Sequence, residues 1–167
     1  MPPPYSRSLR MKGSDYSSTG AYFVTSCTHR RAWLFGHPQL CALAKEVWLE
    51  LLERFSCVQL DAFVVMPNHI HGIIYLLEPM ETDQARTDLN AIVGAFKSII
   101  SVRWLVWIRE NDPNRSGRIW QRGYYERIIR SERQLNATRK YIEDNPRRWA
   151  EDRDNLDALI ECMDERR

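Results

Sequence analysis

The sequence predicts an α+β domain in which helices pack on one face of an antiparallel β-sheet. Three observations favour this fold. Short β-rich segments and longer segments with apolar residues at helical spacing follow one another in the order strand, helix, hairpin, helix, strand, helix. The 167 residues are enough for one domain with its own core. Hydrophobic residues make up 44% of the chain and charged residues 28%, which argues against disorder or a fibrous repeat.

The first half of the chain is predicted to form a strand, a helix and a hairpin. Residues 21–28 are rich in β-forming residues. Pro38 is well placed to open a helix, and apolar residues recur at helical spacing as far as Phe55. The even-numbered positions of residues 58–66 are apolar and are expected on one face of a strand. Residues 70–77 resume a β pattern after a turn, so the two runs are predicted to pair as a hairpin.

The second half is predicted to begin with a helix that Thr87 or Asp88 caps and that continues to about Ile108. Residues 119–129 are β-branched and aromatic enough for a strand, with a possible bend at Gly123. We expect this strand to belong to the same sheet as the earlier strands.

A third helix is predicted to start at Ser131, which forms a capping box with Gln134. It is expected to stop near Asn145, because Pro146 disfavours a helical conformation in the residue before it. Together, the elements give a ferredoxin-like α+β fold with helices on one face of the sheet.

The chain is expected to divide into three segments. Residues 1–19 are predicted to be a flexible basic arm, residues 20–149 the folded domain, and residues 150–167 an acidic tail or short helix. The longest apolar run, residues 70–77, is too short to cross a membrane, and the N-terminus lacks the apolar segment of a signal peptide. We therefore expect a cytoplasmic protein. Neither a zinc knuckle nor a disulfide framework is suggested by the spacing of Cys27, Cys41, Cys57 and Cys162.

Charge is distributed unevenly along the chain. Residues 97–148 carry thirteen basic and six acidic residues, and residues 1–31 carry five basic and one acidic. Tryptophans and tyrosines are interleaved with the basic residues of 97–148, a combination that can bind phosphates and stack on bases. Solvated helical faces explain the same charges equally well.

His69 and His71 are the most informative pair. In a strand they project from the same face, with Ile70 pointing into the core. This spacing suits two ligands of one divalent metal ion. The alternative is a pair of exposed polar positions on a strand.

Tyr141 and Asn145 stand four residues apart and therefore share one face of the third predicted helix. Tyr141 lies beside the expected buried stripe of Leu135, Thr138 and Ile142. Either its hydroxyl reaches a functional site or its ring only packs against the core.

Four ordered motifs together resemble the REP-associated tyrosine transposases, which are relatives of the single-tyrosine, His-hydrophobe-His transposases. They are residues 66–72 (MPNHIHG), 95–98 (AFKS), 119–126 (IWQRGYYE) and 141–146 (YIEDNP), and the strand at 22–25 (YFVT) fits as well. The resemblance extends from about Gly20 to Trp149, so residues 20–149 are identified as the transposase-like catalytic domain.

The resemblance implies a role for each site residue. His69 and His71 match the metal-binding histidines, Asn145 matches a third metal ligand, and Tyr141 matches the nucleophile. The implied cofactor is Mg²⁺ or Mn²⁺. The implied reaction cuts and rejoins single-stranded DNA of hairpin-forming palindromic repeats through a 5′-phosphotyrosine. A non-catalytic binder of such hairpins is the alternative, and RNA binding is a third class.

The expected partner is single-stranded or hairpin DNA, bound by a monomer or a homodimer. Candidate phosphate contacts are Lys97, Arg118, Arg122, Arg127 and Arg130, and candidate stacking residues are Trp120 and Tyr124. Each of these has a core or surface role as its alternative. Arg7, Arg10 and Lys12 of the basic arm either reach the DNA or belong to a passive terminus.

Overall fold

A computed structural model describes residues 19–78 and 87–149. Its strands form one antiparallel sheet in the order β2-β3-β1-β4. With α1 between β1 and β2 and α2 between β3 and β4, this is the predicted ferredoxin-like arrangement. The elements are β1 (Gly20–Cys27), the 3₁₀ turns η1 (His29–Arg31) and η2 (Leu34–Gly36), α1 (Pro38–Arg54), β2 (Val58–Met66), β3 (His69–Leu76), α2 (Leu89–Asn111), β4 (Tyr125–Ile129) and α3 (Glu132–Arg148). The predicted tail at 150–167, Cys162 and all but residue 19 of the predicted arm lie outside the described residues.

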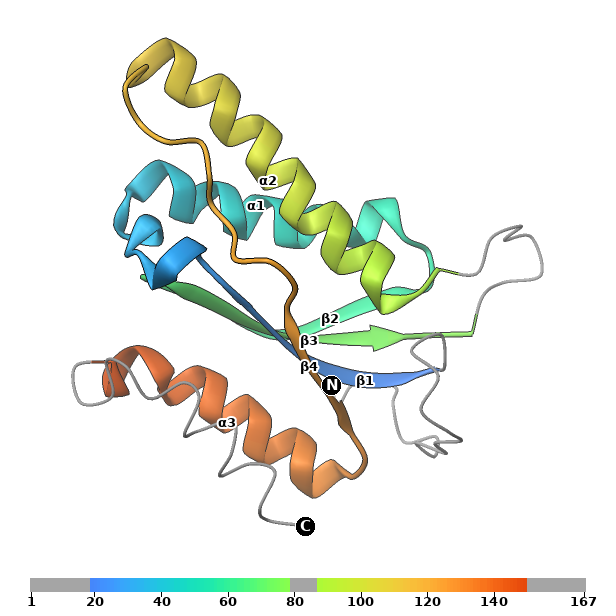
Figure 1. The fold of residues 1–167 in the computed structure, drawn as a ribbon. Coiled ribbons are helices and arrows are strands. Elements are labelled where there is room, and N and C mark those ends of the chain that lie inside the picture. Colours follow the sequence, from blue (N-terminus) through green and yellow to red (C-terminus); the bar gives the residue numbers. More distant parts are fainter. Residues whose placement is uncertain (1–18, 79–86, 150–167) are drawn as a thin grey trace.

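Helices cover both faces of the sheet, which corrects the prediction of helices on one face. Helices α1 and α2 lie on one side and α3 lies on the other (Figure 1). Every residue of β3 is buried, as are the six central residues of β1. A strand that is buried on both sides needs cover on both sides, and its near-continuous apolar sequence is the sign of this.

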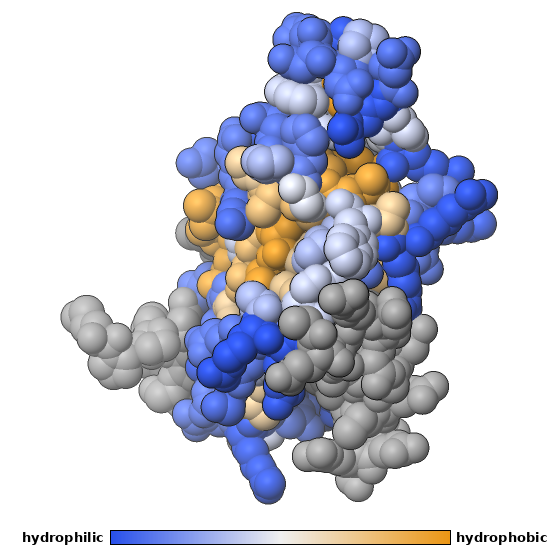
Figure 2. All heavy atoms as spheres, turned by 90° about the vertical axis from the view of Figure 1, so that its left-hand side faces the viewer, coloured by the Kyte–Doolittle hydropathy of each residue, from blue (hydrophilic) through white to orange (hydrophobic). Residues whose placement is uncertain are grey.

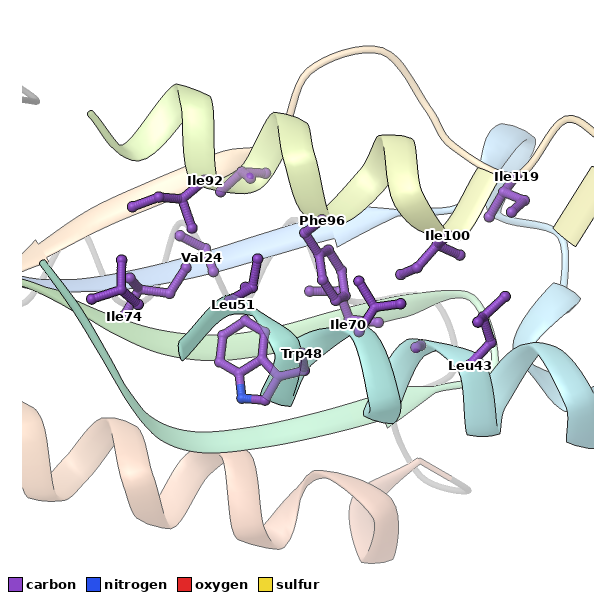
Figure 3. Packing of buried hydrophobic residues seen from close by; sticks show 14 of the residues in the cluster. Val24, Leu43, Trp48, Leu51, Ile70, Ile74, Ile92, Phe96, Ile100 and Ile119 are labelled. Atoms are coloured by element: carbon purple, nitrogen blue, oxygen red, sulfur yellow. The ribbon is translucent and has the colours of Figure 1, made fainter. Parts of the chain in front are cut away.

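The larger core lies between the sheet and the helices α1 and α2. Ile70 packs there together with Trp48, Phe96 and Ile100 (Figure 3). Gly72 is needed for this packing, because a Cβ atom at this position would lie 2.4 Å from the Trp48 ring. The glycine that follows the two histidines is therefore explained by the close approach of α1.

Helix α2 is long enough and apolar enough to cross a membrane, judged by length and composition alone. In the fold, one side of α2 is buried in the core, and its Arg103 forms two hydrogen bonds with Glu50 of α1. Apolar side chains also reach the surface, and on the side of the molecule in Figure 2 hydrophobic residues gather around the middle. The large hydrophobic side chains of α1 and α2 that are exposed are Leu49, Leu52, Val102, Leu105 and Val106.

Strand β2 does not keep its even-numbered residues on one face, as the alternation predicted. Leu60 pairs with Ile74 and Phe63 pairs with Gly72, so β2 contains one extra residue in between. This β-bulge moves the side chains after it to the opposite faces of the sheet. As a result, Leu60 packs towards α1 and α2 whereas Ala62 packs with the core beneath α3.

The strand predicted for residues 119–129 covers only their C-terminal part, β4. Gly123 has a φ of 74°, a conformation that suits glycine and turns the chain. Before this turn, Trp120 forms an isolated bridge with Thr28. The predicted bend is therefore a break in the strand.

Helix α3 begins as predicted and continues past the predicted end. The Ser131 hydroxyl accepts a hydrogen bond from the Gln134 N–H, and the Gln134 side chain accepts one from the Arg130 N–H. Pro146 lies inside the last turn and the helix ends at Arg148. A proline this close to the end removes only one backbone donor, so the last turn can persist.

A charged cluster attaches α3 to the sheet. Arg139 on α3 donates to both carboxylate oxygens of Asp61, with its Nε 3.0 Å from each. Asp61 lies at the bulge of β2 and also accepts a hydrogen bond of 3.0 Å from the Tyr75 hydroxyl. Burial favours a raised pKa for Asp61, but the hydrogen bonds from Arg139, the Ala62 N–H and Tyr75 outweigh it and lower the pKa below 3.8.

Replacing Asp61 with Asn is expected to lower the free energy of unfolding by about 1–3 kcal/mol near neutral pH, because a charge-assisted pair is lost. A carboxyl with a depressed folded pKa stabilises the fold above its unfolded pKa, and this contribution disappears as pH falls through the folded pKa. Urea unfolding should therefore show a difference between the two proteins that shrinks below pH 3.8.

The matched control is Asp112→Asn, which removes an exposed ion pair with Arg115. Its effect should stay within about 0.5 kcal/mol. If Asp61→Asn lowers the free energy of unfolding equally near neutral pH and below pH 3.8, the lost stability does not come from the Asp61 charge.

Candidate active site

The two histidines lie on the α3 face of the sheet, one on each side of Ile70. Thr25 on β1 pairs directly with His71 on β3 and with Tyr125 on β4, so these residues form a row across the sheet. The shared face of the histidines and the core position of Ile70 were both predicted and are confirmed. The alternative, a pair of exposed polar positions, is wrong, because His69 is 5% exposed and His71 is fully buried. Helix α3 covers the face that was expected to be open.

Within the described part of the chain, His69 has one ring nitrogen with a hydrogen-bond partner and one without. Its Nδ1 lies 2.6 Å from the amide oxygen of Asn68, which accepts a hydrogen bond and so fixes the proton on Nδ1. Its Nε2 is buried and has no hydrogen-bond partner among residues 19–78 and 87–149. Burial, followed by the positive charge of Arg31, lowers the pKa of His69 to about 4. The ring is therefore neutral and presents a lone pair on Nε2.

His71 connects the sheet to Tyr141. Its Nδ1 lies 2.7 Å from the Thr25 hydroxyl, and its Nε2 lies 3.2 Å from the Tyr141 hydroxyl. Burial, followed by the neighbouring His69, lowers its pKa well below the usual value. The ring centroids of the two histidines are 4.5 Å apart. Two neutral imidazoles and a phenol thus meet in one small volume.

Tyr141 is held by the core on one side of its ring. Its ring forms a T-shaped pair with Phe23, with ring centroids 6.1 Å apart, and Phe23 stacks on His71 at 5.2 Å. The predicted buried stripe of Leu135, Thr138 and Ile142 is confirmed. The ring therefore packs against the core, and the hydroxyl also contacts His71.

Asn145 is buried on the same side of α3 as Tyr141. One turn before it, Tyr141 contacts His71. One turn after it, the Trp149 ring lies 6.1 Å from the His69 ring. Asn145 is therefore flanked along the helix by two residues that reach the two histidines.

A metal ion at this site would have to be held by His69, His71 and the side-chain amide of Asn145. Within residues 19–78 and 87–149, no three His, Cys, Asp or Glu side chains are grouped so as to hold one. The unpartnered, buried Nε2 of His69 fits a metal ligand, and Asn68 and Thr25 hold the other ring nitrogens as outer partners of ligating histidines do. The side chains present fit a divalent ion.

Three of the candidate DNA contacts have internal partners. The Lys97 ammonium donates to the carbonyls of Gln121 and Gly123 and lies 5.5 Å from the centre of the Trp120 ring. The Trp120 indole donates to the Lys97 carbonyl, and the Tyr124 hydroxyl donates to Asn90 on α2. These contacts hold the segment between α2 and β4.

The other basic candidates lie on the surface or at its edge. Arg118, Arg122 and Arg130 are exposed. Arg127 on β4 pairs with Phe23, so it shares the α3 face of the sheet with the histidines. Arg7, Arg10 and Lys12 lie outside the described residues.

Several residues at the site were not predicted. Thr25 and Asn68 orient the histidines, and Trp33 and Trp149 extend the site towards the surface. Asn68 was recognisable as the neighbour of His69 in the motif. The Thr25 contact depends on the register of strands 46 residues apart and has no local signal.

A ferredoxin-like sheet with a histidine pair beneath a tyrosine-bearing helix is the arrangement expected of a single-tyrosine transposase. The family described as "Transposase IS200 like" matches residues 16–145, and the chain belongs to this family. It is 32% identical over 165 residues to an uncharacterized protein of Haemophilus influenzae, covering 87% of this chain and 91% of that protein. Its fold is similar to that of a REP-associated tyrosine transposase solved bound to a REP hairpin. That match has a TM-score of 0.58 and 22% identity, and it covers 83% of this chain and 73% of the other.

Proposed function

We propose that this protein is a metal-dependent endonuclease and strand transferase for single-stranded DNA of hairpin-forming palindromic repeats, with Tyr141 as nucleophile. The observation that carries the proposal is the Tyr141 hydroxyl, 3.2 Å from Nε2 of a buried, neutral His71. The hairpin substrate is supported by the similar transposase, which was solved with a REP hairpin. We place the activity in the cytoplasm.

The reaction is an exchange of one phosphate ester for another. The Tyr141 oxygen attacks the phosphorus, a phosphotyrosine bond forms to the 5′ side, and the bond to the 3′ oxygen breaks to give a free 3′-hydroxyl. Because the number of ester bonds is unchanged, attack by a 3′-hydroxyl on the phosphotyrosine rejoins strands without ATP. The phenol, with an ordinary pKa of about 10, must lose its proton on attack, and the departing 3′ oxygen takes one up, so the exchange has no net change in protons.

His69 and His71 would hold the ion through Nε2, and Asn145 would add its amide oxygen. A bound Mg²⁺ or Mn²⁺ supplies Lewis acidity to the phosphate and leaves positions for its oxygens. Two nitrogen ligands suit Mn²⁺ better than Mg²⁺, which favours oxygen. Nε2 of His71 could not hold an ion and the hydrogen bond with Tyr141 at the same time, so a bound ion would replace this hydrogen bond.

Replacing Asn145 with Ala is expected to raise the metal concentration needed for cleavage about tenfold or more, because one ligand is lost. The measurement is cleavage rate against Mn²⁺ concentration. Asn145→Asp keeps an oxygen and adds negative charge, so it should lower the concentration needed. If the alanine variant loses stability with an unchanged metal requirement, Asn145 is a structural residue of α3 and the third ligand lies elsewhere.

A labelled hairpin oligonucleotide with a single-stranded flank tests the proposed function. With Mn²⁺ or Mg²⁺, the protein should form a covalent adduct that resists denaturation, and EDTA should prevent it. A scrambled oligonucleotide of the same composition that forms no hairpin is the matched control. Tight hairpin binding without an adduct would favour the non-catalytic binder, and preference for the RNA version would favour RNA binding.

The exposed arginines are proposed to follow the DNA backbone. Arg118, Arg122 and Arg130 are exposed, and Arg127 lies on the same sheet face as the histidines. Tyr141 and His71 meet within one chain, so a monomer already holds the proposed nucleophile beside the histidine pair. This supports a site that does not require exchange of α3 between two copies.

A further inference from the structure

A line of aromatic rings leads from His69 to the surface. The Trp149 ring lies 6.1 Å from the His69 ring, and the Trp33 ring lies 5.9 Å beyond Trp149 in an edge-on arrangement. Trp33 is 59% exposed. Among the described residues, the other large exposed hydrophobic side chains all belong to α1 and α2, on the far side of the sheet. A large exposed ring beside the site is thus unexplained by core packing.

The loop that carries Trp33 is firmly built. Arg30 and Arg31 both have positive φ, at 52° and 53°, a strained conformation for side chains of this size. The Thr28 hydroxyl hydrogen-bonds to the carbonyls of Ala32 and Asn68 and so closes the loop against the turn between β2 and β3. Asn68 in that turn also orients His69. The loop and the histidine are therefore positioned as one unit.

The surroundings of this loop are positively charged. Arg30 of the loop is exposed and Arg31 is half-buried, and the His29 N–H donates to the Ile119 carbonyl, which brings the segment of the exposed Arg118 beside the loop. Proteins that bind single-stranded DNA combine such positive charge with aromatic rings on which bases stack. Trp33 shows this combination, because it is exposed, lies among arginines and is separated from the proposed metal site by one aromatic ring.

We propose that residues 29–33 bind the unpaired nucleotide next to the cleaved phosphate, with Trp33 stacking on its base and Arg31 contacting its backbone. The proposal rests on the proposed function, because it takes the histidine pair as the position of the cleaved phosphate. Stacking on one ring accepts any base, since every base has a π face. The loop would therefore hold the strand in place, while the hairpin supplies recognition.

The test is equilibrium binding in a Tyr141→Phe background, which prevents cleavage during the measurement. The probes are a hairpin with a single-stranded flank and a series of the same oligonucleotide with one abasic position moved along the flank. Trp33→Ala should weaken binding of the intact oligonucleotide about five- to a hundredfold. It should have no effect on the one oligonucleotide whose abasic position removes the stacked base. Trp33→Phe should restore most of the affinity.

Leu49→Ala, at a similarly exposed position on α1, is the matched control and should leave all affinities unchanged. Equal weakening of every oligonucleotide by Trp33→Ala, or no weakening, would overturn the stacking proposal. If the wild-type protein forms the covalent adduct but Trp33→Ala does not change DNA affinity, only this inference is wrong. If Trp33→Ala weakens binding as expected but the wild-type protein never forms an adduct, the stacking site stands and the proposed nuclease function is wrong. If the protein binds no DNA, both are wrong.

Discussion

The Tyr141→Phe variant is expected to lose DNA cleavage by at least about a thousandfold, because it lacks the oxygen that attacks the phosphate. Its affinity for the hairpin should stay within about twofold, since the ring that packs on Phe23 is kept. Cleavage of a labelled oligonucleotide and equilibrium binding measure the two effects. Loss of affinity in parallel with cleavage would indicate a binding role for the hydroxyl.

The same variant tests the competition for His71. Without the hydroxyl, Nε2 of His71 has no hydrogen bond with residue 141, so Mn²⁺ would not have to replace one. Calorimetric titration should show an Mn²⁺ affinity about two- to tenfold higher than in the wild type. A lower affinity would mean that the phenol helps to hold the ion.

An active Phe variant would move the nucleophile to another tyrosine. Tyr125 lies in the same row of the sheet as Thr25 and His71. The Tyr124 hydroxyl, in contrast, is bonded to Asn90 of α2, on the other face. The structure thus places these two neighbouring tyrosines on opposite faces of the sheet.

The His71→Ala variant is expected to lose metal-dependent cleavage and also about 2–4 kcal/mol of stability. His71 is fully buried, and its removal leaves a cavity and deprives the Thr25 hydroxyl of a partner. Urea unfolding and Mn²⁺ titration measure the two losses.

Tyr75→Phe is the matched control for His71→Ala. Tyr75 is on the same strand, and its hydroxyl bonds to Asp61 outside the histidine pair. This variant should be less stable but keep its metal requirement. If His71→Ala is destabilised and still cleaves with an unchanged metal requirement, His71 is a structural residue only.

Local patterns predicted most of the elements. The periodicity from Leu40 to Leu51 marks α1, and the i, i+4 relation of Tyr141 and Asn145 places both on the sheet side of α3. The face that α3 covers could not be read from periodicity, because an amphipathic helix packs equally well on either side of a sheet. The apolar character of β1 and β3 was the available signal for two covered faces.

The remaining differences come from long-range contacts. The bulge at Asp61 is held by Arg139, which is 78 residues away and is not encoded in the alternation of β2. The position of Trp33 depends on two arginines with positive φ, whose conformation only the assembled loop stabilises. The histidine pair and Tyr141 could be proposed from sequence because their motifs are local, whereas their burial is a property of the packed helix.

The most direct measurement is the identity of the residue and the DNA end joined in the covalent adduct. The wild-type protein would be incubated with Mn²⁺ and a hairpin oligonucleotide, digested with a protease and examined by mass spectrometry. The proposed function predicts one modified peptide, carrying nucleotide 5′-phosphate on Tyr141, and a released strand that ends in a 3′-hydroxyl. An adduct on a different residue, a 3′-phosphate linkage or cleaved DNA without any adduct would contradict it.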